Sequence, residues 1–348
     1  MICFFVTRPH RYTIDGFIGG WARSLGRRIS VATYDSLPAR TTLRAHSFVF
    51  TDLERLNATQ RDRAERLAQR IERVGGRVLN RPARVLRRFD LLRRLHDAGR
   101  NPFNAYRVVG AEPPEACRFP VFVREEHEHT GALTDQLHDR AQLLAALARL
   151  RAGAHRTTDL LVVEFCDTRA AADGSFRKYA AMRIGERIVP RHVLISHDWV
   201  DKYPDIVDEA AAREENEFLD HFPHAADVRA AFDLAGIDYG RIDYSCAADG
   251  RVVTWEINTN PLIVPPPNEC SRTRLAAQSS SARQIAEALA ALDGLDVRVS
   301  LSGFPAIGAA GRPRDWVALK SMALCHAPLA RRAVRAVRQV LASARSTN

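Results

Sequence analysis

The stretch "VVTWEINTNP", residues 252–261, decides the fold. It has the apolar character of a buried strand, and successive side chains of a strand point to opposite faces. Glu256 and Asn258 therefore share one face, while Trp255 and Ile257 share the other. The strand gathers a carboxylate and an amide oxygen on one side.

The dipeptide Asp249-Gly250, just before this strand, is a strong hairpin-turn signal. A two-residue loop there predicts that Asp243 lies directly opposite Glu256, with Cβ atoms about 4.5 to 5.5 Å apart. Two like charges in that position favour a bound cation, and magnesium is usually held by one or two carboxylates together with substrate phosphates. The hairpin alone leaves two interpretations open: a Mg-nucleotide anchor, or an exposed polar face on an edge strand.

Working outward from the hairpin, residues 119–258 contain several long apolar stretches that predict strands. Gly174 and Gly185 mark hairpin-like turns between them, and a helix over 137–150 is inserted. We expect an antiparallel α+β region here. The stretches are "FPVFVREE", "LLVVEFCD", "RKYAAMRIG", "ERIVPRHVLIS" and "IDYGRIDYSCA".

The first hundred residues instead alternate short apolar stretches with helical patterns, which predicts a small α/β lobe with a largely parallel sheet. The expected strands are "ICFFVT", "SVATYD", "HSFVFTD" and "RVLN". A long helix is expected to end at Gly75-Gly76, and a second helix to run from Pro82 to Gly99. A further helical segment is expected over 271–294.

The composition is that of an ordinary globular protein: 348 residues, 46% hydrophobic and 26% charged. Without an apolar run of membrane-spanning length, and with an opening "MICFFVT" that lacks a basic flank and a cleavage-like tail, the sequence predicts a cytoplasmic enzyme. Six scattered cysteines without a CxxC pair argue against a disulfide framework and a structural zinc site.

The charge is unevenly spread. The net charge is +10, but residues 312–348 alone carry eight Lys and Arg against one acidic residue, Asp315. The rest of the chain is close to neutral, which argues against nucleic acid as a partner. The basic tail favours a homodimer or a partner protein over stable membrane insertion.

Taken together, "GRIDYS…DGRVVTWEINTNP" resembles the metal-binding hairpin of the ATP-grasp superfamily, and other pieces follow in the family's order over roughly residues 75 to 293. The sequence is similar to the carboxylate–amine ligases of that family, such as D-alanine–D-alanine ligases and ribosomal-protein-modifying glutamate ligases. The resemblance implies an ATP-grasp fold with four segments: an N-terminal α/β lobe (1–80), a central lid lobe (81–175), a C-terminal antiparallel-sheet lobe with the metal hairpin (176–293) and a basic tail (294–348).

The same resemblance implies roles for individual residues. Asp243, Glu256 and Asn258 would bind two Mg²⁺ ions with ATP. The backbone at Glu164, Phe165 and Cys166 would meet adenine, with Glu164 or Asp167 at the ribose. Arg88 and Arg124 fall where the family usually has phosphate-binding lysines.

The strands that cross the site supply further candidates. Lys178 and Arg183 are expected to neutralise phosphate charge, and Arg241, two residues before Asp243, to reach the transferred phosphoryl group. Candidates for an acceptor-substrate pocket are Arg191, His192, His197, Trp199, Lys202, Tyr203 and Asn260.

The loop "EEHEHTGAL" takes the place of a phosphate lid, although it contains a single glycine, Gly131. A lid normally uses several glycines so that backbone amides can approach the nucleotide. His127 and His129 are either replacement donors or solvated loop residues, with a zinc site as a third alternative.

No nucleophile with its base, Walker phosphate loop or dinucleotide-binding motif is found. Metal ligands and cations suit phosphoryl transfer, which needs positioning and charge neutralisation. The expected activity is an ATP- and Mg-dependent ligase that activates a carboxylate as an acyl phosphate for attack by an amine. The alternatives are a phosphotransferase acting on a hydroxyl, and an inactive nucleotide- or partner-binding protein.

Overall fold

A computed structural model describes residues 1–109, 114, 116–129, 131–153, 159–199, 204–263 and 271–308. Lys202, Tyr203 and the basic stretch from Arg312 onward lie outside the described residues. The expectations for those positions therefore stay predictions.

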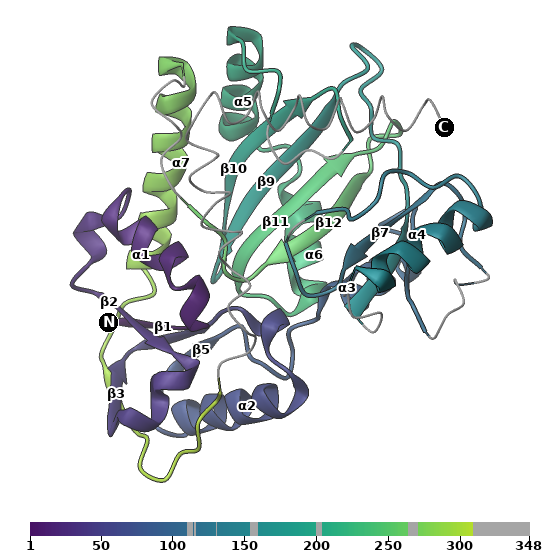
Figure 1. The fold of residues 1–348 in the computed structure, drawn as a ribbon. Helices are drawn as coiled ribbons and strands as arrows, with labels where there is room; N and C mark the ends of the chain where they lie inside the picture. Colours follow the sequence, from purple (N-terminus) through teal and green to yellow (C-terminus); the bar gives the residue numbers. More distant parts are fainter. Residues whose placement is uncertain are drawn as a thin grey trace. The chain divides into compact units, whose positions relative to one another are not determined.

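The N-terminal region contains a four-stranded parallel sheet in the order β2-β1-β4-β5, as the sequence predicts (Figure 1). Both faces are covered by apolar side chains, which explains why the two central strands are buried along their whole length. The strands are β1 (Ile2–Val6), β2 (Ile29–Thr33), β4 (Ser47–Phe50) and β5 (Arg77–Leu79).

Two helices flank this sheet, α1 (Tyr12–Gly19) and α2 (Ala58–Arg73). The side chain of Asn57 accepts from the backbone N–H of Gln60 and the side chain of Gln60 accepts from that of Asn57, a capping box that fixes the start of α2. Gly75, at φ +83°, ends the helix as expected. A small sheet pairs β3 (Thr42–Ala45) with β13 (Val297–Ser300), so part of the segment predicted as a tail joins this region.

The second predicted helix is shorter than the sequence suggested. It is α3 (Arg88–Asp97), because residues 82–84 form a turn and the N–H of Leu86 donates to the carbonyl of Ala235 instead of to its own helix. Gly99, at φ +69°, follows its C-terminus as expected.

A three-stranded antiparallel sheet follows in the order β6-β8-β7, with α4 (Arg140–Ala152) packed against it through Leu143 and Leu147. Its strands are β6 (Ala105–Arg107), β7 (Val121–Glu125) and β8 (Leu160–Glu164).

The largest antiparallel sheet has the order β10-β9-β11-β12 and carries the hairpin from which the sequence argument starts. Figure 1 shows α5 and α7 beside β10. The elements are β9 (Phe176–Ile184), β10 (Arg187–Ser196), α5 (Glu209–His221), α6 (Ala225–Ala235), β11 (Tyr239–Cys246), β12 (Val252–Asn258) and α7 (Arg272–Ala290).

The predicted fold class, a parallel α/β lobe followed by antiparallel α+β sheets, is confirmed. The segment boundaries at 80, 175 and 293 remain predictions. None of the helices in the described part of the chain is both long and apolar enough to cross a membrane.

Candidate functional site

The hairpin β11–β12 pairs Asp243 with Glu256, as predicted, but its turn and its strand register differ from the prediction. The turn has three residues, because Ala247 pairs with Arg251 and Gly250 lies at φ +82° inside the loop. This loop shifts the register by one residue, and a β-bulge beyond Asp243 shifts it back. The two carboxylates face each other because the two irregularities cancel.

The bulge also changes where Trp255 lies. Simple alternation places Trp255 on the face opposite Glu256, but Trp255 lines the same pocket as Glu256. Its ring stacks on Phe103 with 5.1 Å between centroids. An extra residue breaks the two-residue side-chain period, which the sequence alone did not reveal.

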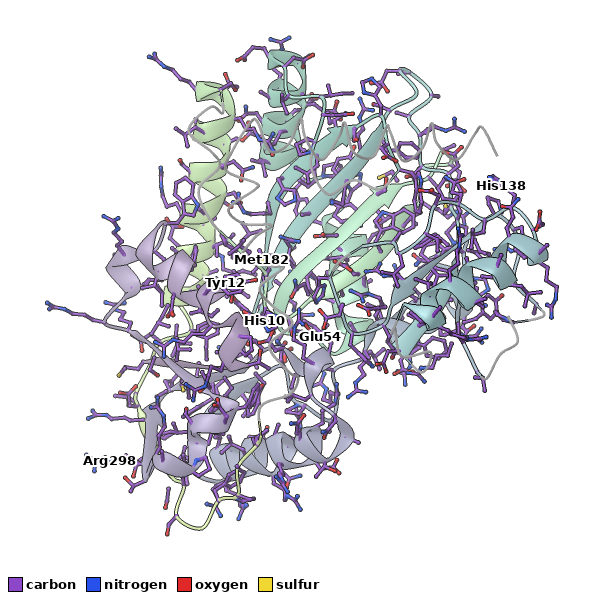
Figure 2. All side chains as sticks on the ribbon, viewed as in Figure 1. His10, Tyr12, Glu54, His138, Met182 and Arg298 are labelled. Atoms are coloured by element: carbon purple, nitrogen blue, oxygen red, sulfur yellow. The ribbon has the colours of Figure 1, made fainter. Side chains whose placement is uncertain are left out.

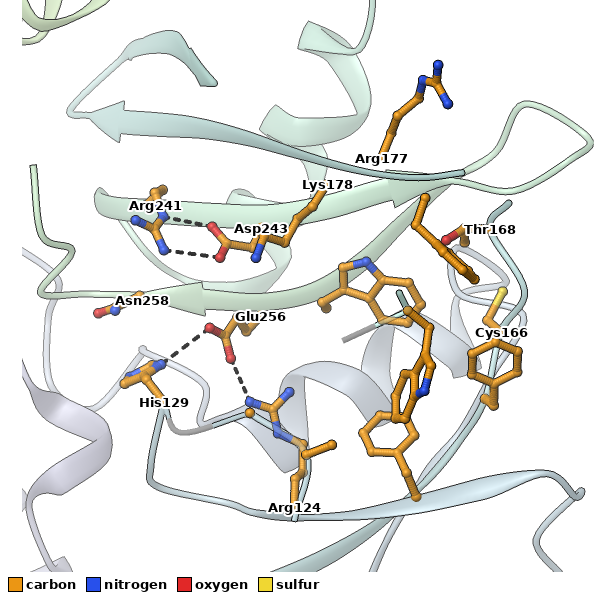
Figure 3. A pocket seen from close by; sticks show the side chains of 17 residues that line it. Arg124, His129, Cys166, Thr168, Arg177, Lys178, Arg241, Asp243, Glu256 and Asn258 are labelled. Carbon is orange, nitrogen blue, oxygen red and sulfur yellow. Dashed lines mark hydrogen bonds and ion pairs between the residues drawn. The ribbon is translucent and has the colours of Figure 1, made fainter. Parts of the chain in front are cut away.

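A cavity of about 270 Å³ lies over this face of the sheet (Figure 3). One part of its wall is aromatic and the other is charged, a combination that suits a ligand with a flat apolar part and a polyanionic part. The aromatic residues are Phe122, Phe165, Phe176, Trp199 and Trp255; the polar ones include Arg124, His129, Thr168, Arg177, Lys178, Arg241, Asp243, Glu256 and Asn258.

Glu256 is held by two arginines and a histidine from three separate segments of the chain. Arg88 and Arg124 each donate to its Oε2, at 2.6 and 2.7 Å, and His129 Nδ1 lies 3.4 Å from its Oε1. Burial alone would raise the pKa of Glu256, but the charges of Arg88 and Arg124 and the contact with His129 hold it well below the usual range. The carboxylate is therefore ionised.

Arg88 and Arg124 repel each other because both are positively charged and lie close together. Burial and the neighbouring Arg88 lower the pKa of Arg124 to about 10, although Glu256 opposes the shift. Asp243 has a cation of its own: Arg241 binds both of its carboxylate oxygens, at 2.7 and 3.1 Å. Each carboxylate predicted to bind metal is thus ion-paired with arginine.

The oxygen donors of the hairpin fit the predicted metal only together with further ligands. Among the described residues, no three His, Cys, Asp or Glu side chains form a cluster that could hold an ion by themselves. Two carboxylates and the Asn258 amide do share one face of the hairpin and one pocket. These are hard oxygen donors, and they fit a magnesium ion that shares its coordination with phosphate oxygens.

Arg88, which the sequence predicts to bind phosphate, instead donates hydrogen bonds to the loop that begins at Glu125. Its Nη1 donates to the carbonyls of Glu125, Glu126 and Glu128, at 2.9, 2.7 and 2.8 Å, and its Nη2 to Glu256. Arg88 is 7% exposed and does not line the cavity. It anchors the loop, whereas Arg124 faces the cavity.

The same loop is tied to the N-terminal region. His129 Nε2 lies 3.2 Å from Glu54 Oε1, and Arg55 donates to Glu128 at 3.0 Å. Burial would lower the pKa of His129, but the contacts with Glu256 and Glu54 raise it above its usual value. His129 therefore bridges two carboxylates and is not a solvated loop residue, and within the described part of the chain it belongs to no cluster of His, Cys, Asp or Glu that could hold zinc.

The predicted nucleotide hinge is only partly in the cavity. Phe165 and Cys166 line it, as does Thr168, which the sequence argument did not select. Glu164 is buried and points elsewhere: its carboxylate accepts from Arg118 and Tyr106, and from the backbone N–H of Asn104. Asp167 is ion-paired with Arg169. Neither carboxylate lines the cavity, so the expected ribose contact finds no support.

Of the two cations predicted on β9, only Lys178 lines the cavity. Arg183 pairs with Asp233 and donates to the carbonyl of Gly185 at 2.9 Å, away from the cavity. The two positions are an odd number of residues apart, so they lie on opposite faces of the strand. This odd spacing is visible in the sequence and could have shown that Lys178 and Arg183 do not face the same side.

Of the described residues predicted for the acceptor pocket, Trp199 lines the cavity and the others lie outside it. Trp199 belongs to the aromatic part of the cavity, with its ring 5.0 Å from Phe122 and 5.6 Å from Phe165. His197 is exposed and lies 3.4 Å from Asp205. Arg191 and His192 lie on β10, outside the cavity wall.

Asn260, just after β12, forms hydrogen bonds with the N-terminal region. Its Nδ2 donates to Asp52 at 3.0 Å and to the carbonyl of His10 at 3.2 Å, while Thr13 donates to its Oδ1 at 2.6 Å. In Figure 2, His10 and Glu54 are labelled where the N-terminal sheet meets the foot of the hairpin sheet. Asn260 therefore fixes the end of β12 against the N-terminal region instead of facing the cavity.

The sequence matches no protein-family model and no curated protein. Among solved structures, the chain is similar to the VanG D-Ala:D-Ser ligase from Enterococcus faecalis, with 14% identity over 71% of this chain and 72% of that one, and a TM-score of 0.40. It is also similar to an L-amino acid ligase from Bacillus licheniformis, with 12% identity over 81% and 74% of the two chains and a TM-score of 0.39. Both TM-scores are below 0.5, so the functional argument rests on the residues of the cavity.

Proposed function

We propose that the protein is an ATP- and Mg²⁺-dependent ligase that activates a carboxylate as an acyl phosphate, which an amine then attacks to form an amide. The observation that carries the proposal is the cavity itself. It joins an aromatic wall to a charged wall, and the charged wall contains the Asp243–Glu256 pair and Asn258.

Each part of the cavity suits one part of Mg-ATP. Phe165 and Trp199 offer flat apolar surfaces for a purine base. Lys178, Arg124 and Arg241 offer positive charge to the triphosphate. Asp243, Glu256 and Asn258 would hold magnesium, which would supply neutralisation of the phosphate charge.

The chain's residues would act by positioning. A carboxylate oxygen of the acid attacks the γ-phosphorus of ATP and ADP leaves; the amine nitrogen then attacks the acyl carbon, phosphate leaves and the nitrogen loses a proton. Arg241, beside Asp243, would stabilise negative charge that develops on the transferred group. Phosphate oxygens would also bind Arg124 and Arg241, the two cavity-lining arginines that now pair with Glu256 and Asp243, and this would leave carboxylate oxygens available to the metal.

The first test is the thermal midpoint of the protein with magnesium alone, ATP alone and both together. A ligand present at about 100 times its Kd stabilises the folded state by about 2.7 kcal/mol, so a rise is expected that needs both components. Acid and amine pairs are then screened for release of ADP and phosphate. A phosphotransferase would leave the phosphate on a single acceptor, and a protein without catalytic activity would release no ADP with any pair.

A second expected result concerns Lys178. Lys178→Ala should raise the KM for ATP about 10- to 100-fold, because a charge-assisted contact to phosphate is worth about 1.5 to 3 kcal/mol. Lys178 lies on the wall that carries Asp243. Steady-state kinetics beside the control Lys320→Ala checks this, and equal KM values for the two variants would remove Lys178 from the site.

A further inference from the structure

A β-bulge on β10 creates a second charged area on the hairpin sheet. The pairing of β10 with β9 slips between Pro190 and His192, which leaves Arg191 as the extra residue. β10 is the edge strand of its sheet, and Arg191 bonds to Gln278 of α7. His192 keeps its pairing with Ala180.

That pairing puts His192 on the same face as the proposed metal ligands. His192 lies opposite Ala180, Ala180 opposite Asp243, and Asp243 opposite Glu256. Directly opposed residues share a face, and neighbouring strands are about 4.8 Å apart. Between His192 and Asp243, two strands away, this row contains only the methyl group of Ala180.

Positive charge converges on His192. Burial, and after it the positive charges of Arg241, Arg191, Lys178 and Arg274, hold the pKa of His192 well below its usual range. The imidazole is therefore neutral. It adds no charge of its own and offers one donor and one acceptor nitrogen.

The arginines of this area outnumber their carboxylate partners among the described residues. Arg241 pairs with Asp243, while Arg191 and Arg274 both depend on Glu215. The pair of Arg274 and Glu215 is loose: Nε and Oε2 lie 3.3 Å apart, and neither atom makes a hydrogen bond in the described part of the chain. Arg191 is buried, and Arg241 and Arg274 are partly buried, with side chains 20% and 21% exposed. Like charges in such positions without full compensation cost free energy, which a bound anion would recover.

We propose that Arg191, His192, Arg241 and Arg274, the edge-strand cation cluster, bind a second carboxylate of the acid substrate. This inference rests on the proposed function and specifies it. The carboxylate to be activated lies towards the hairpin, and the second one lies across Ala180 towards His192 and Arg274. The acid is therefore a dicarboxylate and not a simple monocarboxylate.

The test compares glutarate with valerate, which have the same carbon chain and differ in the second carboxylate. Each is titrated by calorimetry into the full-length protein in the presence of Mg²⁺ and ADP. Glutarate is expected to bind at least tenfold more tightly than valerate. In Arg274→Gln, the Kd for glutarate should rise about tenfold while that for valerate stays unchanged.

Arg272→Gln is the matched control, because Arg272 lies in the same first turn of α7 and is exposed. It should change neither Kd. The rise of the thermal midpoint with Mg²⁺ and ADP, measured on every variant, reports separately on folding and on the nucleotide site, so failure of the nucleotide proposal is recognised there. Equal binding of the two acids, no binding of glutarate, equal weakening of both acids by Arg274→Gln, or tighter binding of inorganic phosphate than of glutarate would overturn the inference.

Discussion

Glu256→Gln is expected to abolish Mg-dependent ATP turnover and also to destabilise the ligand-free protein. The sequence argument alone predicts loss of a metal ligand with the fold intact. The structure adds a second consequence, because Arg88 and Arg124 both bind the carboxylate and are nearly buried. Removing one partner of a buried ion pair costs about 3 to 5 kcal/mol, since the remaining charge loses its compensation.

Two measurements on Glu256→Gln separate these effects. The thermal midpoint without ligand reports the stability loss, and the further rise with ATP and magnesium reports the site; the first should fall and the second should disappear. Glu186→Gln is the control, since that side chain is 84% exposed in the β9–β10 turn. An unchanged ligand-induced rise in Glu256→Gln would exclude Glu256 as a metal ligand.

Arg88→Lys, which restores the residue type that the family resemblance expects, should impair the protein instead of improving it. A guanidinium reaches three loop carbonyls and Glu256 at once, while an ammonium is a compact charge that cannot span them. Hydrogen bonds to charged groups are worth about 1.5 to 3 kcal/mol each, so losing even one or two is a large effect. Faster amide hydrogen exchange over residues 125–129 and a lower thermal midpoint are the expected readouts.

The control for this change is Arg93→Lys on the same helix, where the side chain is 38% exposed and lies 4.0 Å from Asp97. It should leave both readouts near the parent values. If Arg88→Lys kept loop exchange at the parent rate and lowered the KM for ATP, Arg88 would be a phosphate ligand and not an anchor.

The sequence predicted those helices and strands whose signal lies within a single short segment of the chain. The parallel strands and the helix ended by Gly75 follow from periodicity and helix-end chemistry, and the opposition of Asp243 and Glu256 was predicted as well. The opposition was nevertheless reached through a two-residue loop that does not exist. A bulge carries no distinctive residue, so the compensating shift at Trp255 was not predictable from composition.

The contacts at the site that the sequence did not predict are contacts between distant segments. Nothing near Arg88 in the sequence indicates that it binds three carbonyls of residues 125, 126 and 128, and nothing near Glu164 indicates that Arg118 donates to its carboxylate. Trp199 follows a stretch of acceptor candidates, but its ring packs between Phe122 and Phe165. Such contacts depend on how separate segments meet, and a pattern within one segment does not encode them.

The aromatic wall gives the protein an optical reporter of its own. The part of the chain that the structure describes contains three tryptophans, and two of them, Trp199 and Trp255, line the cavity. Both already contact phenylalanine rings, so a base that inserts beside them changes the polarity around two indoles at once. Intrinsic fluorescence can therefore follow ligand entry in the unlabelled protein on a stopped-flow timescale.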